Sequence, residues 1–314
     1  MTHAVVSRFV RDAFLPLRWA VTALPRGSFL RSACVPPVKW ASSRRAFLEG
    51  LSEVRPLDRP DISFEATDSM VVDDVYWFGV QGYEGVLADL WSRLCAEASS
   101  VLEIGANIGF YSVIGGKASR GRYTAVEPLP EVAAVLRANL RRNGLDRTEV
   151  LEGAAIQDAT RRRVTLNVPD EQRAAPVGAH LTTDSEVAQR SSLRTITVDG
   201  FPMRELAEGR DVIKIDAEGI EHALLTSVMP LLVESRPTLV LEVLPESDHL
   251  AAVICELARA AEYAIHVVPG YGSDQVVAIA PDRFNAHTPG QYKSKDVILA
   301  PPQGPSPSRS GARP

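Results

Sequence analysis

The sequence predicts an α/β protein with a Rossmann-like, mostly parallel sheet and helices on both of its faces, preceded by a helical N-terminal extension. Two observations support this prediction. Between about residues 61 and 300, seven short β-rich runs follow one another: SVLEIG, RYTAVEP, TEVLEGAAI, DVIKID, TLVLEVLP, YAIHVVP and QVVAIAP. Their Val, Ile and Leu residues are continuous rather than alternating with polar ones, which is typical of strands buried on both faces.

The second observation is that helical patterns separate these runs. LPEVAAVLRANLRRN has apolar residues near helical spacing, and EGIEHALLTSVMPLL follows the fourth run. A β-α-β-α order predicts parallel strands covered on both sides, because each helix returns the chain to the same edge of the sheet. The stretch from Asp158 to Thr195 interrupts this order. DATRRRVTLNV is expected to add an edge strand or hairpin, and the polar residues after it form either a lid or binding loop or a disordered segment.

Composition limits the classes of function. The net charge of −5 gives no overall attraction to nucleic acid. Cys34, Cys95 and Cys255 lie far apart, without a Cys-x-x-Cys pair or histidines at metal-ligand spacing. Neither a disulfide framework nor a structural zinc site is indicated, so the sequence predicts a reducing, cytoplasmic environment.

The N-terminal extension, residues 1–60, differs in charge from the rest. Residues 1–48 hold eight basic side chains against one acid, a net +7 that leaves −12 for the remainder. The apolar piece AFLPLRWAVTAL is too short to span a bilayer and lacks the features of a secretory signal. It could be an amphipathic anchor on an anionic membrane or a helical arm packed on the main domain or a second subunit. The arm is the favoured interpretation.

Residues 61–300 form the main domain, and the Pro/Ser/Gly/Arg-rich residues 301–314 are expected to be disordered.

A glycine turn follows the first run, in VLEIGANIGFYS. In open parallel sheets, ligands bind beyond the carboxyl ends of the strands, and the next helix N-terminus attracts an anionic group. A dinucleotide loop needs glycine in the middle position, where this chain has Asn107, and a nucleoside triphosphate loop needs a Lys-Ser/Thr pair, which is absent. A ligand with a carboxylate and no phosphates therefore fits best.

Two acids extend this interpretation. Glu127 ends the second run at the distance from Gly105 expected of a residue that accepts both hydroxyls of a ribose. An adenosine with an amino-acid carboxylate and no phosphate describes S-adenosylmethionine. Glu103 lies within the buried first run, where a charge is costly unless it is paired. The ammonium of the methionine moiety is its expected partner.

The motifs LEIGANIGFYS, AVEP, VDGF, IKIDAEGIEHALL and LVLEVLP resemble, in this order, those of FkbM-type S-adenosylmethionine-dependent O-methyltransferases of class I. The most specific of them is the Lys-x-Asp-x-Glu-Gly-x-Glu string from Lys214 to Glu221. The resemblance covers residues from about 80 to 300. It implies a seven-stranded sheet with an antiparallel last strand, and methyl transfer to a hydroxyl of a sugar, a polyketide, a glycolipid or another specialised metabolite.

The resemblance also implies a set of cofactor-binding residues. Many class I enzymes have an acid beside the adenine, where this chain has two alanines, so no side chain is assigned to that contact. The expected cofactor residues are Glu103, Gly105, Ala106, Asn107, Gly109, Tyr111, Glu127, Pro128, Ala155 and Asp216.

Methyl transfer from a sulfonium requires alignment and removal of the acceptor proton. Asp216 ends the fourth run and Glu218 follows it closely. Carboxylates crowded in a closed pocket are expected to have raised pKa values, which makes them better bases. In the alternative interpretation, the acids of DAEGIE cap the start of a helix, with Glu221 as the capping residue. Lys214 is expected to neutralise one of the acids or to contact the substrate.

The other expected site residues come from separate parts of the chain. Glu242, at the end of LVLEVLP, faces the same rim and could bind the substrate hydroxyl or, with Asp216, a divalent cation; metal dependence is the disfavoured interpretation. His180 and His249 are candidate bases or substrate contacts. Tyr83 and Glu84, in the aromatic stretch DDVYWFGVQGYEG, suit a ring-shaped acceptor, although these aromatics could equally form a hydrophobic plug.

The predicted function is thus methyl transfer from S-adenosylmethionine to a small hydroxylated acceptor, without a nucleic-acid partner. Two alternatives stay open. A methyltransferase acting on RNA or protein would need a basic rim or an Asn/Asp-Pro-Pro-aromatic loop, where this chain has DAEG. A non-catalytic binding protein could retain the fold, and the intact set of carboxylates argues against it.

Overall fold

The computed structural model describes residues 15–24, 30, 33, 48, 50–160, 162–169, 193–217, 219–270, 275–305 and 307. The chain divides into two compact units, Met1–Ala88 and Asp89–Pro314, so that the division falls within helix α5 (Gly85–Glu97). The boundaries expected near residues 60 and 300 remain predictions.

The first unit contains short elements. A helix covers residues 15–23, and β1 (Glu53–Val54) pairs with β2 (Phe64–Glu65) in antiparallel orientation. Helix α3 (Met70–Phe78) begins where the Ser69 hydroxyl accepts from the Val71 N–H, and it ends at Gly79, whose φ is 72°. The Asp58 carboxylate then accepts from two backbone N–H groups at the start of α4 (Val80–Tyr83). Both helix starts are therefore capped by side-chain oxygens.

The second unit is built on an eight-stranded sheet with the order β12-β11-β13-β10-β9-β3-β4-β5. The four pairs from β10 to β5 are parallel, and the three pairs that involve β13 or β12 are antiparallel. The strands are β3 (Ser100–Ile104), β4 (Arg122–Glu127), β5 (Glu149–Glu152), β9 (Val212–Ile215), β10 (Thr238–Glu242), β11 (Ala264–Val267), β12 (Val277–Ile279) and β13 (Asp296–Ala300).

The central strands are buried along their length, as the continuous apolar runs predict: all residues of β3 and β9 are buried. Helix α11 buries Leu250, Ile254, Leu257 and Ala261 against one part of the core, at the helical spacing that the apolar stripe requires. The helices of this unit are α6 (Phe110–Ala118), α7 (Pro130–Arg142), α8 (Met203–Ala207), α9 (Glu221–Ser227), α10 (Met229–Ser235), α11 (Asp248–Ala261) and α12 (Thr288–Gln291). The predicted Rossmann-like α/β class is confirmed.

A second, three-stranded sheet has the order β6-β8-β7. The predicted hairpin is present, because β7 (Arg163–Pro169) pairs with β8 (Leu193–Pro202) in antiparallel orientation, while β6 (Ala154–Ile156) pairs with β8 in parallel. The long polar loop expected after β7 lies outside the described residues, as do the tail residues 308–314.

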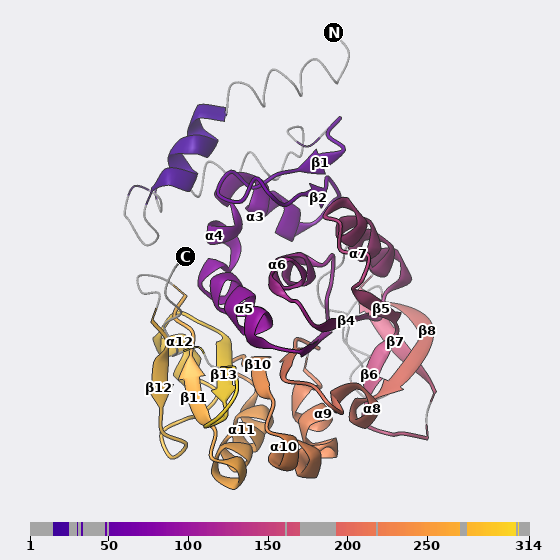
Figure 1. Ribbon diagram of the computed structural model, residues 1–314, viewed down its shortest axis with the longest axis vertical. Helices are drawn as coiled ribbons and strands as arrows, with labels where there is room; N and C mark the ends of the chain where they lie inside the picture. The colour runs from indigo at the N-terminus through magenta and orange to yellow at the C-terminus, as the bar shows by residue number, and fades with distance from the viewer. Residues whose placement is uncertain are drawn as a thin grey trace. The chain divides into compact units, whose positions relative to one another are not determined.

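Three expectations about the elements are wrong. The main sheet has eight strands in the described part of the chain rather than seven, because β13 also pairs; Figure 1 shows this strand between β10 and β11. The single run TEVLEGAAI divides at Gly153 into β5 and β6, which belong to different sheets. The helix expected across EGIEHALLTSVMPLL divides at Val228 into α9 and α10, since Pro230 near the start of α10 cannot donate to the preceding turn.

Two further findings concern the cysteines and the lengths of the helices. Cys95 and Cys255 are free thiols and are buried. Within the described residues, no helix combines the length and the apolar character that crossing a bilayer requires.

Candidate active site

The glycine turn has the backbone geometry that its sequence predicts. Gly105, Asn107 and Gly109 all have positive φ values, of 77°, 50° and 88°. Asparagine tolerates this left-handed region better than other side chains that carry a Cβ, and glycine adopts it at no steric cost. The turn is anchored to the neighbouring strand, because the Gly105 and Ala106 N–H groups both donate to the Val126 carbonyl, at 3.0 and 3.1 Å.

Glycine is also required here for space. A Cβ at Gly105 would lie 1.7 Å from the carbonyl oxygen of Asp216, and a Cβ at Gly109 would lie 2.5 Å from the Leu136 side chain. The Asp216 N–H in turn donates to the Ile104 carbonyl at 3.0 Å. The predicted cofactor turn and the end of β9 are therefore in direct backbone contact.

Glu127, the predicted ribose acid, lies at the end of β4 with 5% of its surface exposed. Its carboxylate accepts from the Asn107 N–H at 2.8 Å and from the Leu129 N–H at 3.0 Å. Burial raises the pKa of Glu127 to about 7, although these two hydrogen bonds oppose the shift. The carboxylate is thus held in one orientation beside the turn, and it retains further acceptor positions for hydroxyl donors.

Glu103 has partners that the sequence did not indicate. Its carboxylate accepts from the hydroxyls of Ser112 and Tyr123, both at 2.6 Å, and only 1% of the residue is exposed. Burial raises the pKa of Glu103, against the lowering effect of the Lys214 charge. The expected methionine ammonium is not needed to explain this buried acid, because the two hydroxyls compensate its desolvation.

Lys214 and Asp216 form an ion pair at the carboxyl end of β9. The Lys214 Nζ donates to Asp216 Oδ2 at 2.8 Å and lies 4.8 Å from the centre of the Tyr111 ring. The Lys214 side chain is 6% exposed and that of Asp216 is 32% exposed, so the carboxylate faces the open rim. This ion pair is the neutralisation of one acid by Lys214 that the sequence predicted.

The predicted raised pKa of Asp216 is wrong. Burial does raise the pKa of Asp216, but the charge and hydrogen bond of Lys214, together with the charge of Lys295, outweigh it, so the net pKa lies below its ordinary value. A carboxylate beside an ammonium is stabilised in its ionised form. Asp216 therefore remains ionised at neutral pH.

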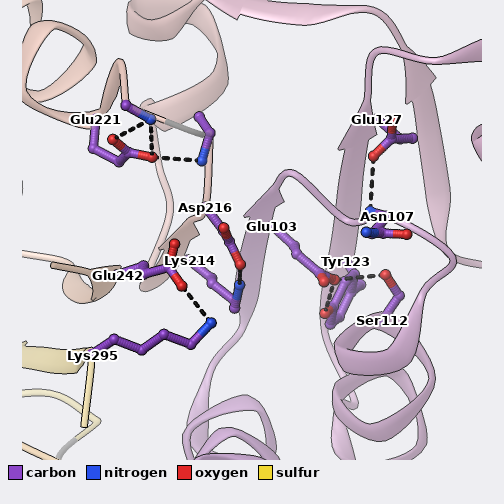
Figure 2. A network of polar contacts seen from close by, with 12 residues as sticks. Glu103, Asn107, Ser112, Tyr123, Glu127, Lys214, Asp216, Glu221, Glu242 and Lys295 are labelled. Atoms are coloured by element: carbon purple, nitrogen blue, oxygen red, sulfur yellow. Dashed lines mark hydrogen bonds and ion pairs between the residues drawn. The ribbon is translucent and has the colours of Figure 1, made fainter. Parts of the chain in front are cut away.

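Glu242, at the end of β10, pairs with Lys295, which precedes β13. Burial and the negative charge of Asp216 raise the pKa of Glu242, and the charge of Lys295 opposes this shift. Figure 2 shows the two ion pairs on neighbouring strands, Lys214 with Asp216 and Lys295 with Glu242. The rim thus holds two carboxylates with pKa values shifted in opposite directions.

The DAEG segment is closed by Glu221. Its carboxylate accepts from the Ala217 N–H at 2.8 Å and from the Gly219 N–H at 3.0 Å (Figure 2). These N–H groups precede α9, and its N-cap residue, Ile220, has no side-chain cap hydrogen bond. Glu221 therefore closes the DAEG turn rather than capping the helix start as the alternative interpretation expected. Glu218 lies outside the described residues.

Three more predicted cofactor residues lie around the turn. Tyr111, in the first turn of α6, is 6% exposed and its carbonyl accepts from the Trp91 indole N–H at 3.0 Å. Pro128 is half-buried between β4 and α7. Ala155 is buried in β6, close in sequence to Gly153, whose N–H donates to the Glu127 carbonyl at 3.0 Å. No observation assigns a contact with the cofactor to any of the three.

The remaining predicted residues belong to other elements or lie outside the described residues. His249 is exposed in the first turn of α11, with its ring 5.7 Å from that of His222. Tyr83 and Glu84 are half-buried in the first compact unit, and their role in substrate binding stays a prediction. In α3 nearby, Tyr76, Trp77 and Phe78 are buried, which fits the hydrophobic plug. His180 lies outside the described residues.

Sequence reasoning missed Ser112, Tyr123 and Lys295. The first two have no signal in the chain, because their partner Glu103 becomes their neighbour only through the packing of α6 and β4. Lys295 could have been found, since the four-residue apolar run VILA begins two residues after it and is followed by two prolines. No group of three or more His, Cys, Asp or Glu side chains that could hold a metal ion is found among the described residues.

The described residues fit S-adenosylmethionine. The glycines let the turn pack directly against the end of β9 and against Leu136, and Glu127 offers an oriented carboxylate to ribose hydroxyls beside this turn. Asp216 and Glu242 place carboxylate oxygens on the same rim, each beside a lysine.

Solved structures of methyltransferases are similar to this chain at low identity. The FkbM methyltransferase of Methylobacillus flagellatus is 19% identical with a TM-score of 0.39, over 65% of this chain and 44% of its own length. An O-methyltransferase from Bacillus cereus, solved with SAH, is 18% identical with a TM-score of 0.35, over 68% and 78%. An rRNA methylase from Streptococcus thermophilus is 8% identical with a TM-score of 0.38, over 70% and 96%. With TM-scores below 0.5, these likenesses say nothing of the acceptor.

No curated protein matches the chain in sequence. The family described as "Methyltransferase FkbM domain" matches residues 103–263, which are 161 of the 314 residues. This match begins at Glu103 and includes the glycine turn, Glu127 and the Lys214–Glu221 string. It confirms the predicted family and, with it, S-adenosylmethionine as the cofactor. The chain therefore belongs to the FkbM methyltransferase family and is an S-adenosylmethionine-dependent methyltransferase.

Proposed function

We propose that this methyltransferase transfers the methyl group to a hydroxyl of a small acceptor, namely a sugar, a polyketide or a glycolipid of specialised metabolism. The observation that carries the proposal is the pair of carboxylates on the rim. Asp216 and Glu242 stand at the carboxyl ends of adjacent parallel strands, each paired with its own lysine. A hydroxyl is a poor nucleophile until a base takes its proton, and carboxylates are suited to this task.

The two carboxylates are assigned different roles. Glu242 is the base, because its raised pKa brings it closer to the operating pH, where general bases are most effective. Asp216 remains ionised beside Lys214 and orients the acceptor hydroxyl. When bound, S-adenosylmethionine would supply the methyl group and leave as S-adenosylhomocysteine. Glu242 would take the proton that the acceptor hydroxyl loses.

Charge supports a small acceptor over a nucleic acid. Outside residues 1–48 the chain carries a net −12, and the two lysines on the rim, Lys214 and Lys295, are each paired with a carboxylate. Nucleic-acid affinity depends on neutralising phosphates with basic side chains, so a rim whose lysines are already paired is unfavourable for such an acceptor. A cytoplasmic location, where S-adenosylmethionine is made, is part of the proposal.

The proposal is tested by following S-adenosylhomocysteine release with three groups of acceptors: hydroxylated sugars, polyketides and glycolipids; total RNA; and unfolded protein. We expect turnover with the first group alone. The product should resist mild alkali, because a methyl ether is stable where a methyl ester hydrolyses. Release with RNA or protein alone, or an alkali-labile product, would contradict the proposal. Binding of S-adenosylhomocysteine without turnover on any acceptor would favour the non-catalytic alternative.

A further inference from the structure

The helix at residues 15–23 buries its charged residue and exposes apolar residues, which is the reverse of an ordinary surface helix. Its only charged residue, Arg18, is 8% exposed, and Val21 is completely buried. The exposed positions are all apolar and lie on one side at helical spacing: Leu15, Pro16, Trp19, Ala20 and Ala23. A surface helix normally turns its polar face to water. This helix presents an apolar face instead.

Contacts of Arg18 fix this orientation within the first compact unit. Its guanidinium donates through Nε to the Tyr76 carbonyl and through Nη2 to the Arg55 carbonyl at 2.6 Å. It also lies 3.9 Å from the centre of the Tyr76 ring. Arginine stays protonated even when buried, so these acceptors and the aromatic face compensate its desolvation. Turning the apolar face inward would break all three contacts.

The apolar face is unusual within the described part of the chain. Four large hydrophobic residues are exposed there, Leu15, Trp19, Leu30 and Met70, and two of them belong to this helix. Trp19 is 57% exposed and Leu15 is 41% exposed. Tryptophan is enriched where an apolar phase meets water, because its ring is apolar and its N–H is polar.

The charge of the surrounding sequence indicates which kind of surface this apolar face would bind. Residues 1–48 carry eight basic side chains and one acid, with Arg11 shortly before the helix and Arg26 shortly after it. An apolar face in a segment whose sequence carries net positive charge complements a surface with an apolar interior and a negative exterior. Membranes that contain anionic lipids have these two properties, and basic residues near such a surface are each worth about 1 kcal/mol.

We propose that helix 15–23 docks this protein on anionic lipid surfaces, with Leu15 and Trp19 inserted at the level of the headgroups. This is peripheral binding: the helix lies in the interface and does not cross the bilayer. The helix belongs to the first compact unit and Asp216 and Glu242 belong to the second, and the proposal does not depend on the identity of the acceptor.

The test is co-sedimentation of the full chain with vesicles. Vesicles of phosphatidylcholine mixed with phosphatidylglycerol should bind the protein, and vesicles of phosphatidylcholine alone should not. Raising the salt concentration should weaken binding, because exposed charges are screened. Trp19→Glu should reduce binding by about tenfold or more, since it removes a large apolar side chain and adds a negative charge. Met70→Glu is the matched control, because Met70 is also apolar and 47% exposed in the same unit. It should leave binding unchanged.

Both variants should keep the wild-type melting temperature and the wild-type affinity for S-adenosylhomocysteine, because both side chains are exposed. Three outcomes would overturn the proposal. The first is no sedimentation with anionic vesicles. The second is equal binding by wild type and Trp19→Glu. The third is a wild-type dimer that Trp19→Glu dissociates without any binding to vesicles, which would identify a second copy of the chain as the occupant of this face.

Discussion

A Cβ on Gly105 would lie 1.7 Å from the backbone oxygen of Asp216, so the turn after β3 and the end of β9 touch through their main chains. This contact sets the position of the Asp216 carboxylate relative to the cofactor turn. A side chain at residue 105 would therefore displace both parts of the site at once.

Gly105→Ala should lower the melting temperature and weaken S-adenosylhomocysteine binding. Gly144→Ala is the matched control, because Gly144 has a similar φ, 69° against 77°, and open space around its Cβ position. The control isolates the cost of the left-handed backbone, about 1–2 kcal/mol. Thermal unfolding and calorimetric titration of both variants measure the difference. Equal losses of stability would show that the close contact with Asp216 has no energetic weight.

Asp216→Asn should lower turnover by about 100-fold or more, because the amide cannot bind the acceptor hydroxyl as a charged acceptor does. Affinity for S-adenosylhomocysteine should stay within several-fold of wild type. The melting temperature should fall, since the buried Lys214 ammonium loses its charged partner. Steady-state rates with the acceptor found in the screen, and titration calorimetry, give these values. Glu246→Gln, which changes an exposed acid shortly after β10, is the control. Full activity of Asp216→Asn would remove this residue from the chemistry.

The pH dependence of kcat/KM should report Glu242. If Glu242 is the base, the rate rises with pH as this carboxyl loses its proton, and Glu242→Gln abolishes that limb of the profile. Lys295→Met should move the limb to higher pH, because the Lys295 charge opposes the raised pKa of Glu242. Lys293→Met, an exposed lysine two residues earlier, should leave the profile unchanged. A limb that stays in place in Lys295→Met would assign the titration to another group.

The stability of the free protein should fall as the pH rises from about 5 to 7. Burial raises the pKa of Glu127 from 4.5 to about 7, so in this range the folded protein holds a proton that the unfolded chain has released. The stabilising contribution is complete below the unfolded pKa and is lost as the pH passes the folded one. A difference of this size in pKa corresponds to about 3 kcal/mol. Thermal unfolding of wild type and Glu127→Gln across this range should show the steeper decline in wild type; parallel curves would contradict the assignment.

The sequence predicted those features that depend on short stretches of chain. The order of buried strands follows from continuous apolar runs, and Lys214 meets Asp216 because alternate residues of a strand lie on one face. The backbone of the glycine turn follows from Gly105, Asn107 and Gly109. The sign of the pKa shift of Asp216 was predicted wrongly, since the crowding of acids was given more weight than the adjacent lysine.

Features that depend on register could not be predicted in this way. Tyr123 reaches Glu103 because β4 pairs with β3 so that Ala125 stands opposite Glu103. Lys295 reaches Glu242 because β13 lies antiparallel to β10, with Asp296 opposite Glu242. Neither strand register can be predicted from one segment of the sequence, because each results from the packing of whole elements.

The place of β13 has a consequence for biosynthesis. Residues 296–300 fill the gap between β10 and β11, and β11 is translated some thirty residues earlier. While the ribosome is still adding those residues, β10 and β11 both have unpaired edges, and an open strand edge can pair with another chain. The main sheet can therefore close only after β13, the last strand of the described residues, has been made.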